Sequence, residues 1–462
     1  MTSPSEPRAA AHGEDAGATA ASTASTASPT APAEARSEAE RIRDLTRATA
    51  TASPLAQPPA EPGFGEGVRA YLARLRGGDI GSLPAVLGLV VLFLLFSALR
   101  PDTFPTPGNI ANLLVQASSI IVLAMGLTFV LLLGDIDLSA GVAGGAAAAV
   151  MALIFRDQGW PWYAGLLGAL LTGLVIGTLI GLLVSRIGIP SFVVTLAFFL
   201  GVQGITLWLI GEGGTIAVRD PVVIAIANEN VPVWLGWVLA VGTSLAYAAV
   251  SFGRWAGQRR RGLTRDNIGL VALRVVAVAV VLLVLTAILS QNRARVPSIV
   301  LAGIPYSVPV IAALLVVLTL VLGRTAYGRH VYAVGGNPEA ARRAGISVRG
   351  IRMSVFMIGS TLAALSGVID ASRLNSVAPG SGGGNTLLLG VGAAVIGGTS
   401  LFGGKGRVSN AVIGGMVIAT IANGLGLLGQ SAFVNYLVTG AVLLLAAAVD
   451  AISRRRRASA AI

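Results

Sequence analysis

The chain has 462 residues, of which 54% are hydrophobic and only 12% charged, and its formal net charge is +12. Soluble globular domains carry about a quarter charged residues, so this composition, with a mean hydropathy of +0.78, predicts a polytopic membrane protein. The absence of cysteine and the presence of only two histidines exclude a disulfide framework, a cysteine-ligated metal site and a thiol nucleophile. No nucleic-acid-binding motif accompanies the arginines, so the charge predicts membrane topology and no nucleic-acid partner.

The start of the chain differs in composition from the rest. Residues 1–65 are rich in Ala, Ser, Thr, Pro and Glu and hold almost no aromatic or large aliphatic side chains. Such a segment cannot bury enough apolar surface to offset the entropy of ordering, so we expect a disordered cytoplasmic tail. The first residues lack the features of a cleavable signal peptide, and none is expected. We expect the membrane domain at 66–457 and a short cytoplasmic tail at 458–462.

Apolar runs of roughly 17 to 25 residues recur after the tail, each long enough to cross a hydrocarbon core of about 30 Å as a helix. They predict an all-α polytopic membrane protein, in contact with membrane lipid, with about twelve transmembrane helices at 84–100, 110–133, 138–155, 162–185, 190–211, 233–253, 268–290, 304–323, 354–373, 385–402, 408–428 and 433–452.

Clusters of arginine predict the orientation of these helices. They lie at 69–76 before the first span, at 254–265 after the sixth and at 454–457 after the last. With twelve spans all three fall on one face, which is therefore predicted to be cytoplasmic, together with both termini. The opposite face has short loops, none of which could fold alone as a substrate-binding domain.

A polar and basic segment at 324–353 interrupts the apolar runs and contains a short helix with marked ends. Asn337 can cap this helix, Pro338 can occupy its first position, and Gly345 can take the left-handed conformation that ends it. A helix of about seven residues is not stable alone in water. It is therefore either a capped loop helix without a partner or a helix that leans on a partner at the cytoplasmic face.

Charged residues follow the dipole of this short helix. Glu339 lies at its positive N-terminal end, and Arg342 and Arg343 lie at its negative C-terminal end. Ala340 and Ala341 stand between them. Together with the residues that mark its ends, these side chains form the candidate partner-binding set.

Two carboxylates, Asp135 and Asp137, interrupt a long apolar stretch between Gly134 and Ser139. A charge near the bilayer centre costs at least about 2.5 kcal/mol on insertion scales, so acids at this depth usually face a polar cavity or a partner. Span counting instead places the turn at the cytoplasmic end of the second and third spans, where both carboxylates would be the solvated cap of the next helix. Span counting favours the solvated cap, and the alternative stays open.

A glycine-rich segment at 397–406 superficially resembles a phosphate-binding loop. Such a loop needs Gly five residues before its Gly-Lys pair and a hydroxyl residue after the Lys, but these places hold Thr399 and Gly406. No other nucleotide-binding signature is found, so no cofactor is expected to bind this chain. We expect instead a tight turn between two spans, formed by Gly397, Gly398, Thr399, Ser400, Gly403 and Gly404.

Small residues recur at every fourth position of the fourth predicted span, at Gly165, Ala169, Gly173, Gly177 and Gly181. This ridge predicts the close approach of another helix. The amides scattered through other spans suit either interhelical hydrogen bonds or contacts with sugar hydroxyls; they are Asn112, Gln116, Gln203, Asn385, Asn423 and Asn435.

Several of these segments resemble the monosaccharide branch of ABC-importer permeases. Glu339, Ala340, Ala341 and Gly345 look like the EAA loop, although the distal Ile-x-Leu-Pro part of that motif is missing. The 134–141 stretch is similar to the signature Gly-Gly-Ile-Asp-Leu-Ser-x-Gly, with one glycine matched, and 397–404 is similar to Gly-Gly-Thr-Ser-Leu-x-Gly-Gly. The additional spans at 233–253 and 268–290, with the arginine-rich loop between them, resemble xylose permeases.

The resemblance implies a type II-like permease of the bacterial cell membrane that is not itself an enzyme. Two copies would form the pathway, a separate extracytoplasmic binding protein would deliver a monosaccharide such as xylose, and two ABC ATPase subunits would bind ATP and Mg²⁺. The EAA-like helix would seat in a groove of the ATPase. The signature turns would belong to the family fold or to the pathway.

Two other classes compete with this interpretation. An ion-coupled secondary transporter usually carries buried ionisable pairs and an internal repeat, whereas the predicted spans hold few acids beyond Asp135, Asp137 and Asp370, and no clear repeat is found. A membrane enzyme would need a metal, a nucleophile or an acid and base pair, and none is evident.

Overall fold

The computed structural model describes residues 65, 82–261, 267–294, 296 and 298–459. All of them belong to one compact unit, Glu61–Ile462. The predicted N-terminal tail lies outside the described residues apart from Gly65, and the predicted C-terminal tail is described only as far as residue 459.

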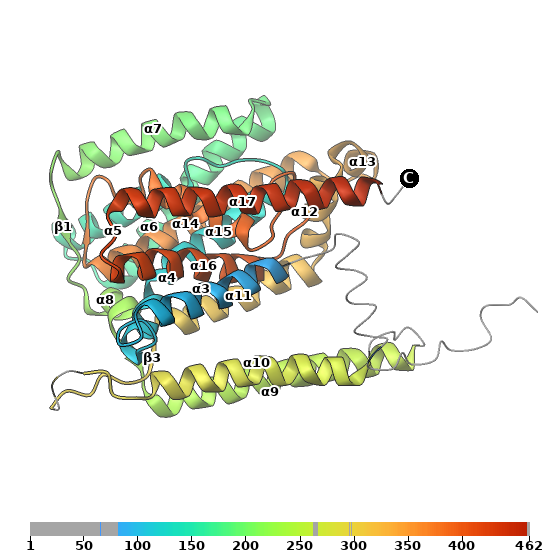
Figure 1. Cartoon of the computed structure of the whole chain (residues 1–462). Coiled ribbons are helices and arrows are strands. Elements are labelled where there is room, and N and C mark those ends of the chain that lie inside the picture. Colours follow the sequence, from blue (N-terminus) through green and yellow to red (C-terminus); the bar gives the residue numbers. More distant parts are fainter. Residues whose placement is uncertain (1–64, 66–81, 262–266, 295, 297, 460–462) are drawn as a thin grey trace, which may run out of the picture. The chain divides into compact units, whose positions relative to one another are not determined.

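Each of the predicted spans coincides with a helix that is labelled in Figure 1. Within the described residues, nine helices are long and apolar enough to cross a membrane. The helices that correspond to predicted spans are α3 (Leu83–Leu99), α4 (Pro107–Leu132), α5 (Ala140–Leu153), α6 (Trp162–Leu182), α7 (Ser191–Ile210), α9 (Val233–Arg260), α10 (Ile268–Leu289), α11 (Ser307–Arg324), α14 (Val348–Leu374), α15 (Asn385–Ile396), α16 (Val408–Leu427) and α17 (Ala432–Ser459).

Three of these helices are shorter in their apolar part, namely α3, α15 and the Ala432–Leu445 part of α17. Helix α15 ends at Ile396, whereas the span was predicted to reach residue 402. The cause is the Gly397–Gly398 pair, since Gly398 adopts a φ of +108° that a continuing helix cannot contain. Two π-helical turns, η1 (Ile154–Gln158) and η2 (Leu183–Ile187), extend α5 and α6.

The ridge of small residues on α6 allows the close approach of another helix, as predicted: most of it packs against α14, and Gly165 at its start lies against Met151 and Phe155. Its five members are all buried. A Cβ atom on Gly173 or Gly177 would lie 2.5 Å from the carbonyl oxygen of Ser360 or Phe356, both on α14. Larger side chains would therefore force the two helices apart. Buried side chains of α4, α14 and α16 fill the space beside them and form the largest core cluster.

The predicted pair of additional helices, α9 and α10, lies side by side (Figure 1). Almost none of the apolar side chains of α9 and α10 are buried within the described chain. Exposed apolar helices of this kind suit a hydrocarbon environment.

Short strands connect loops at one end of the helices. Strand β1 (Ile216–Ala217) pairs with β4 (Ser376–Val377), and β2 (Asn230–Val231) pairs with β3 (Ile304–Pro305). A short helix, α8 (Pro221–Asn228), lies between β1 and β2 and is capped by Asp220. These loops follow α7, α8, α10 and α14, and their pairing agrees with the predicted alternation of faces.

Candidate functional site

The predicted short helix is present as α13 (Pro338–Arg343), and its ends form as the sequence predicts. The Asn337 side chain accepts hydrogen bonds from the backbone N–H groups of Glu339 and Ala340, both at 3.0 Å. Pro338 occupies the first helical position, and Gly345 has a φ of +81°. The cap and the left-handed glycine therefore fix where α13 begins and ends.

One face of α13 is anchored and the other is exposed. Ala341 is 4% exposed and belongs to the main core cluster. On the outer face, Arg342 Nη1 donates to Glu339 Oε2 at 2.8 Å and Arg343 Nε donates to Glu339 Oε1 at 3.4 Å. Ala340 is also exposed. The helix thus presents a charged surface to any partner while a buried alanine holds it to the bundle.

The connection from α13 into the bundle is short. The backbone N–H of Ile346 donates to the carbonyl oxygen of Ala341 at 3.0 Å. The Ser347 side chain then caps α14 by accepting from the N–H of Gly350. Only residues 344–347 separate the two helices, so a displacement of α13 acts directly on the start of α14.

A further helix, α12 (Ala326–Gly336), precedes α13 and was not predicted as a separate element. Thr325 caps it, and Gly335 packs so closely on the end of α4 that a Cβ atom there would collide with the carbonyl oxygen of Leu132. The same Cβ atom would lie 3.0 Å from the backbone nitrogen of Gly404. This glycine is required because two backbones meet it.

The prediction that Asp135 is a solvated helix cap is wrong. Asp135 is 5% exposed, and Arg352 on α14 donates from Nε to its Oδ2 at 2.8 Å. Burial raises the pKa of the Asp135 carboxyl, and the Arg352 guanidinium together with Ser191 opposes this rise. The alternative interpretation, a carboxylate that faces a partner, is the one that applies.

Asp137 is also buried, at 1% exposure, and is not solvated. Its Oδ1 accepts hydrogen bonds from the backbone N–H of Ser139 at 2.9 Å and from the Ser139 hydroxyl at 2.6 Å, just before α5 begins. Within the part of the chain that the structure describes, its Oδ2 has no hydrogen-bond partner. Burial raises the pKa of the Asp137 carboxyl, and the hydrogen bonds from Ser139 and Ala140 partly oppose the rise.

The backbone of the 134–139 turn is held by α7 as well. The N–H of Ile136 donates to the Ser191 hydroxyl at 3.4 Å, and the Thr195 hydroxyl donates to the carbonyl oxygen of Ile136 at 3.2 Å. Both side chains lie in the first turns of α7. The turn therefore connects α14, through Arg352, with α7.

The predicted glycine-rich turn between two spans joins α15 to α16. Gly398, Gly403 and Gly404 have positive φ angles, and Thr399 and Ser400 are buried. The N–H of Gly404 donates to the carbonyl oxygen of Leu132 at 2.8 Å, at the end of α4. The Tyr332 hydroxyl of α12 donates to the carbonyl oxygen of Gly406 at 2.8 Å. The segment is thus a structural turn.

The three segments singled out in the sequence therefore meet at one place. A Cβ atom on Gly403 would lie 2.9 Å from the nitrogen of Gly134 and 2.9 Å from the carbonyl oxygen of Gly335. We call this meeting point of the 134–139 turn, the end of α12, the start of α14 and the 397–406 turn the α13 junction. The sequence pattern did not identify Gly335, Arg352 or Ser191 as members, because their partners are distant in the chain.

Comparison with known proteins assigns the chain to a family. The family model described as the branched-chain amino acid transport system permease component matches residues 109–447. The chain belongs to this permease family. The match includes every segment of the α13 junction and confirms the family predicted from the motifs.

Individual relatives of the permease are components of sugar transport systems. The xylose transport system permease protein XylH of Escherichia coli K12 is 33% identical over 374 residues, which cover 80% of this chain and 92% of the relative. The D-allose transport system permease protein AlsC of the same organism is 30% identical over 364 residues, covering 78% and 89%. Its ribose import permease protein RbsC is 29% identical over 370 residues, covering 79% and 92%. No solved structure matches the chain.

The permease is thus a multi-pass membrane protein whose family motifs meet beside the end of α12 and the start of α14, the two helices that flank α13. The junction holds α13 from two sides, through Gly335 before it and through Arg352 after it. Such an arrangement can carry a rigid displacement from an exposed helix to the ends of α4, α7 and α14.

Proposed function

We propose that this permease is the membrane-spanning subunit of an ATP-driven importer for a monosaccharide and that α13 is its coupling helix. The observation that carries the proposal is the exposed, capped α13, tied to the transmembrane helices through the ion pair between Arg352 and Asp135. The sequence has no nucleotide-binding motif, so the energy has to come from a partner. The family membership and the EAA-like residues support an ABC ATPase as that partner.

In this mechanism, ATP-driven closure of two ATPase subunits moves α13. Because only residues 344–347 connect α13 to α14, α14 moves with α13. The Arg352–Asp135 contact then passes the displacement to the 134–139 turn and to α7. A partner shifts such an equilibrium only by binding one conformation more tightly than the other. The face that carries α13 is cytoplasmic in this proposal, in agreement with the arginines at the end of α9.

A second permease copy completes the pathway, and a separate binding protein delivers the sugar at the end that carries the β1–β4 and β2–β3 pairs. The ATP and Mg²⁺ are bound by the ATPase chains. The relatives named for xylose, allose and ribose support a monosaccharide, and the slightly higher identity to the xylose protein favours a pentose such as xylose. Uptake of labelled xylose, allose and ribose by cells that express the full transporter tests the substrate.

The coupling role of α13 is tested by substituting Gly345 with leucine. At a φ of +81° a leucine costs about 1 to 2 kcal/mol in backbone strain, and its Cβ would meet no atom of the described chain within 4 Å. We expect membrane insertion to persist while uptake is lost, because the new side chain lies on the docking surface. Glu339→Lys should also abolish uptake.

Gly188 is the matched control for Gly345. It has a φ of +87°, and a Cβ atom there would likewise be clear of every described residue. Gly188→Leu should therefore carry the same strain and keep its uptake. Normal ATPase co-purification and transport in Gly345→Leu would refute the docking role. Uptake that fails on ATP depletion but survives an uncoupler would separate this function from ion-coupled transport.

A further inference from the structure

We propose that the segment 380–386, which precedes and begins α15, lines a water-filled pathway and that Asn385 and Tyr436 contact the transported monosaccharide there. The proposal rests on the function proposed above and adds the location of the sugar pathway.

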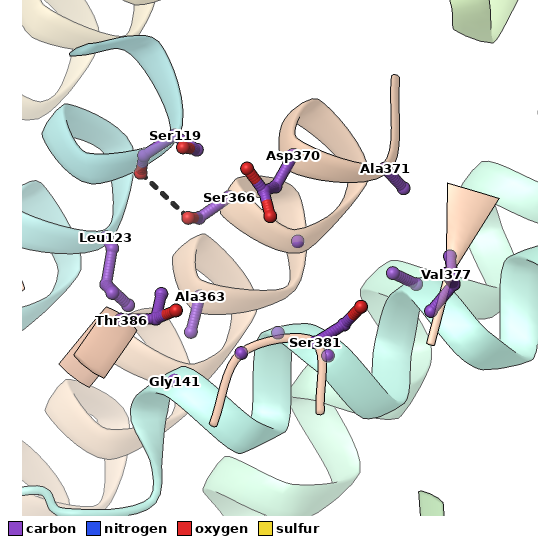
Figure 2. Close-up of a pocket in the computed structure, with 15 residues that line it drawn as sticks. Ser119, Leu123, Gly141, Ala363, Ser366, Asp370, Ala371, Val377, Ser381 and Thr386 are labelled. Carbon is purple, nitrogen blue, oxygen red and sulfur yellow. Dashed lines mark hydrogen bonds between the residues drawn. The ribbon is translucent and has the colours of Figure 1, made fainter. Parts of the chain in front are cut away.

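The segment 380–386 lies near the middle of the bundle, although the sequence predicts an outer loop for its residues 380–384. A Cβ atom on Gly382 would collide with the carbonyl oxygen of Gly141 and lie 2.8 Å from the nitrogen of Gly145, in the first turns of α5. Between these two residues, Gly144 lies against α14, where a Cβ atom would be 2.5 Å from the carbonyl oxygen of Ala363. Figure 2 shows the ribbon that carries Ser381 crossing α5 close to Gly141.

Ala363 fixes the depth of this contact. It is eleven residues from the Leu374 end of α14 and fifteen from the Val348 end, which correspond to about 16 and 22 Å along the helix axis. Half of the hydrocarbon core is about 15 Å. The turn before α15 therefore lies deep within the membrane-spanning part. Helix α15 starts from this depth, so its twelve residues, about 18 Å, need to cross only the remaining part of the membrane.

Polar groups of this segment are nevertheless exposed. Gly380, Gly384 and Asn385 are exposed, and Ser381 and Thr386 are half-buried. Irregular backbone at membrane depth does not face lipid, because its N–H and C=O groups would lose hydrogen bonds; it is found only inside protein or along a water-filled cavity. The exposed side of the segment therefore faces water or a second copy of the chain.

The chemistry of the neighbouring side chains favours a sugar pathway. Asn385 Nδ2 donates to the Tyr436 hydroxyl of α17, and both residues are exposed. The Gln203 amide of α7 lies 3.6 Å from the position of a Cβ atom on Gly383. Amides and a tyrosine offer donors and acceptors to sugar hydroxyls and an aromatic face to the sugar ring. An interface between two apolar helix faces would not need this set.

A small cavity on the inner side of the segment is too closed to be the pathway itself. Ser119, Ser366, Asp370, Ser381 and Thr386 contribute its polar lining (Figure 2). Its volume is about 20 Å³, room for about one water molecule. Asp370 is already paired with Arg373 at 3.0 Å. Sugar contact is therefore assigned to the exposed side of the segment, where Asn385 and Tyr436 lie.

The native chain has no cysteine, so single-cysteine variants report on water access directly. The test uses the full-length chain with its transport partners in cell membranes, the variants Gly380→Cys and Asn385→Cys at two exposed positions of the segment, and a charged, water-soluble methanethiosulfonate reagent. Val281→Cys is the control, because Val281 is 64% exposed on the apolar α10. A thiol in hydrocarbon stays protonated and unreactive, so we expect residues 380 and 385 to react about tenfold faster or more than 281.

Sugar protection then decides between a pathway and another wet surface. Xylose should slow the labelling of residue 385 several-fold, and Tyr436→Phe should raise the KM for uptake about fivefold or more, as expected for one lost polar contact. The proposal would be overturned if both cysteines were labelled as slowly as the one at residue 281, or if two copies of the Asn385→Cys variant formed a disulfide with each other and were not labelled. The proposal would also be overturned if xylose, allose or ribose were taken up normally but did not slow the labelling of the cysteine at residue 385. Failure of the wild type to take up any of them would overturn the proposed function, and the labelling rates do not depend on that result.

Discussion

Replacing Arg352 with glutamine should destabilise the permease because it leaves the Asp135 carboxylate buried without its cation. The contact is 2.8 Å long, and the two side chains are 34% and 7% exposed for arginine and aspartate. Breaking a fully buried pair costs about 3 to 5 kcal/mol, and an exposed pair is worth at most about 1 kcal/mol. With one partner buried and the other a third exposed, we expect a loss of about 2 kcal/mol.

A double-mutant cycle isolates this contact. For a chain of 462 residues the loss corresponds to a decrease in Tm of about 2 °C. Asp135→Asn, Arg352→Gln and the double variant are compared by thermal unfolding in detergent, and we expect a coupling free energy of about 1 to 2 kcal/mol between the two positions. The pair Glu339–Arg342 has the same length but is mostly exposed, so its coupling should stay below about 0.5 kcal/mol. Additive effects at positions 135 and 352 would refute the ion pair as a connection between α14 and the turn.

Three other substitutions follow from the packing and the charges. Gly177→Leu should strongly reduce the yield of folded protein, because its Cβ would lie 2.5 Å from the Phe356 carbonyl oxygen. Gly88→Leu on α3 should be tolerated, because its Cβ would meet nothing within 4 Å among the described residues. Equal yields of the two variants would contradict the α6–α14 contact. Gly335→Ala should lower both Tm and uptake. Gly336→Ala should change neither, because its Cβ has open space in the described part of the chain. Similar behaviour of the two variants would show that the α13 junction tolerates a side chain at residue 335. Burial raises the pKa of the Asp137 carboxyl above 3.8, so the native state holds its proton at a pH where the unfolded chain has lost it. The stability of the wild type relative to Asp137→Asn should therefore fall as pH rises through that raised pKa. A pH-independent difference in Tm between the two proteins would contradict this sign.

The sequence predicted the elements whose determinants are local. The cap at Asn337, the end at Gly345 and the helical ridge of small residues need only neighbouring residues or a fixed spacing, and all three are present. The family resemblance was carried by short motifs in the same way and is confirmed. These features could be recognised because each is complete within one segment.

The features that were missed depend on contacts between distant segments. Arg352 and Asp135 are 217 positions apart in the sequence. Span counting infers membrane depth from the hydropathy of consecutive residues, so it cannot predict a contact between residues that are distant in the chain. It therefore treated a buried carboxylate as solvated. The end of α15 is a different case, because its cause is local: hydropathy, which averages over Gly397 and Gly398, placed the end at residue 402, whereas the turn predicted from these two glycines marks where the helix does end.

The roles proposed for α13 rest on its contact with an ATPase, and one crosslinking measurement tests that contact. Ala340 is exposed on α13, and the natural absence of cysteine allows Ala340→Cys to be the only thiol in the permease. Val281→Cys on α10 serves as the control. We predict that a maleimide–benzophenone reagent, attached to the single thiol and then activated by light to insert into a nearby C–H bond, joins residue 340, but not residue 281, to the co-expressed ABC ATPase and that joining the two stops uptake. An ATPase that co-purifies with the permease but cannot be crosslinked from residue 340 would contradict the account.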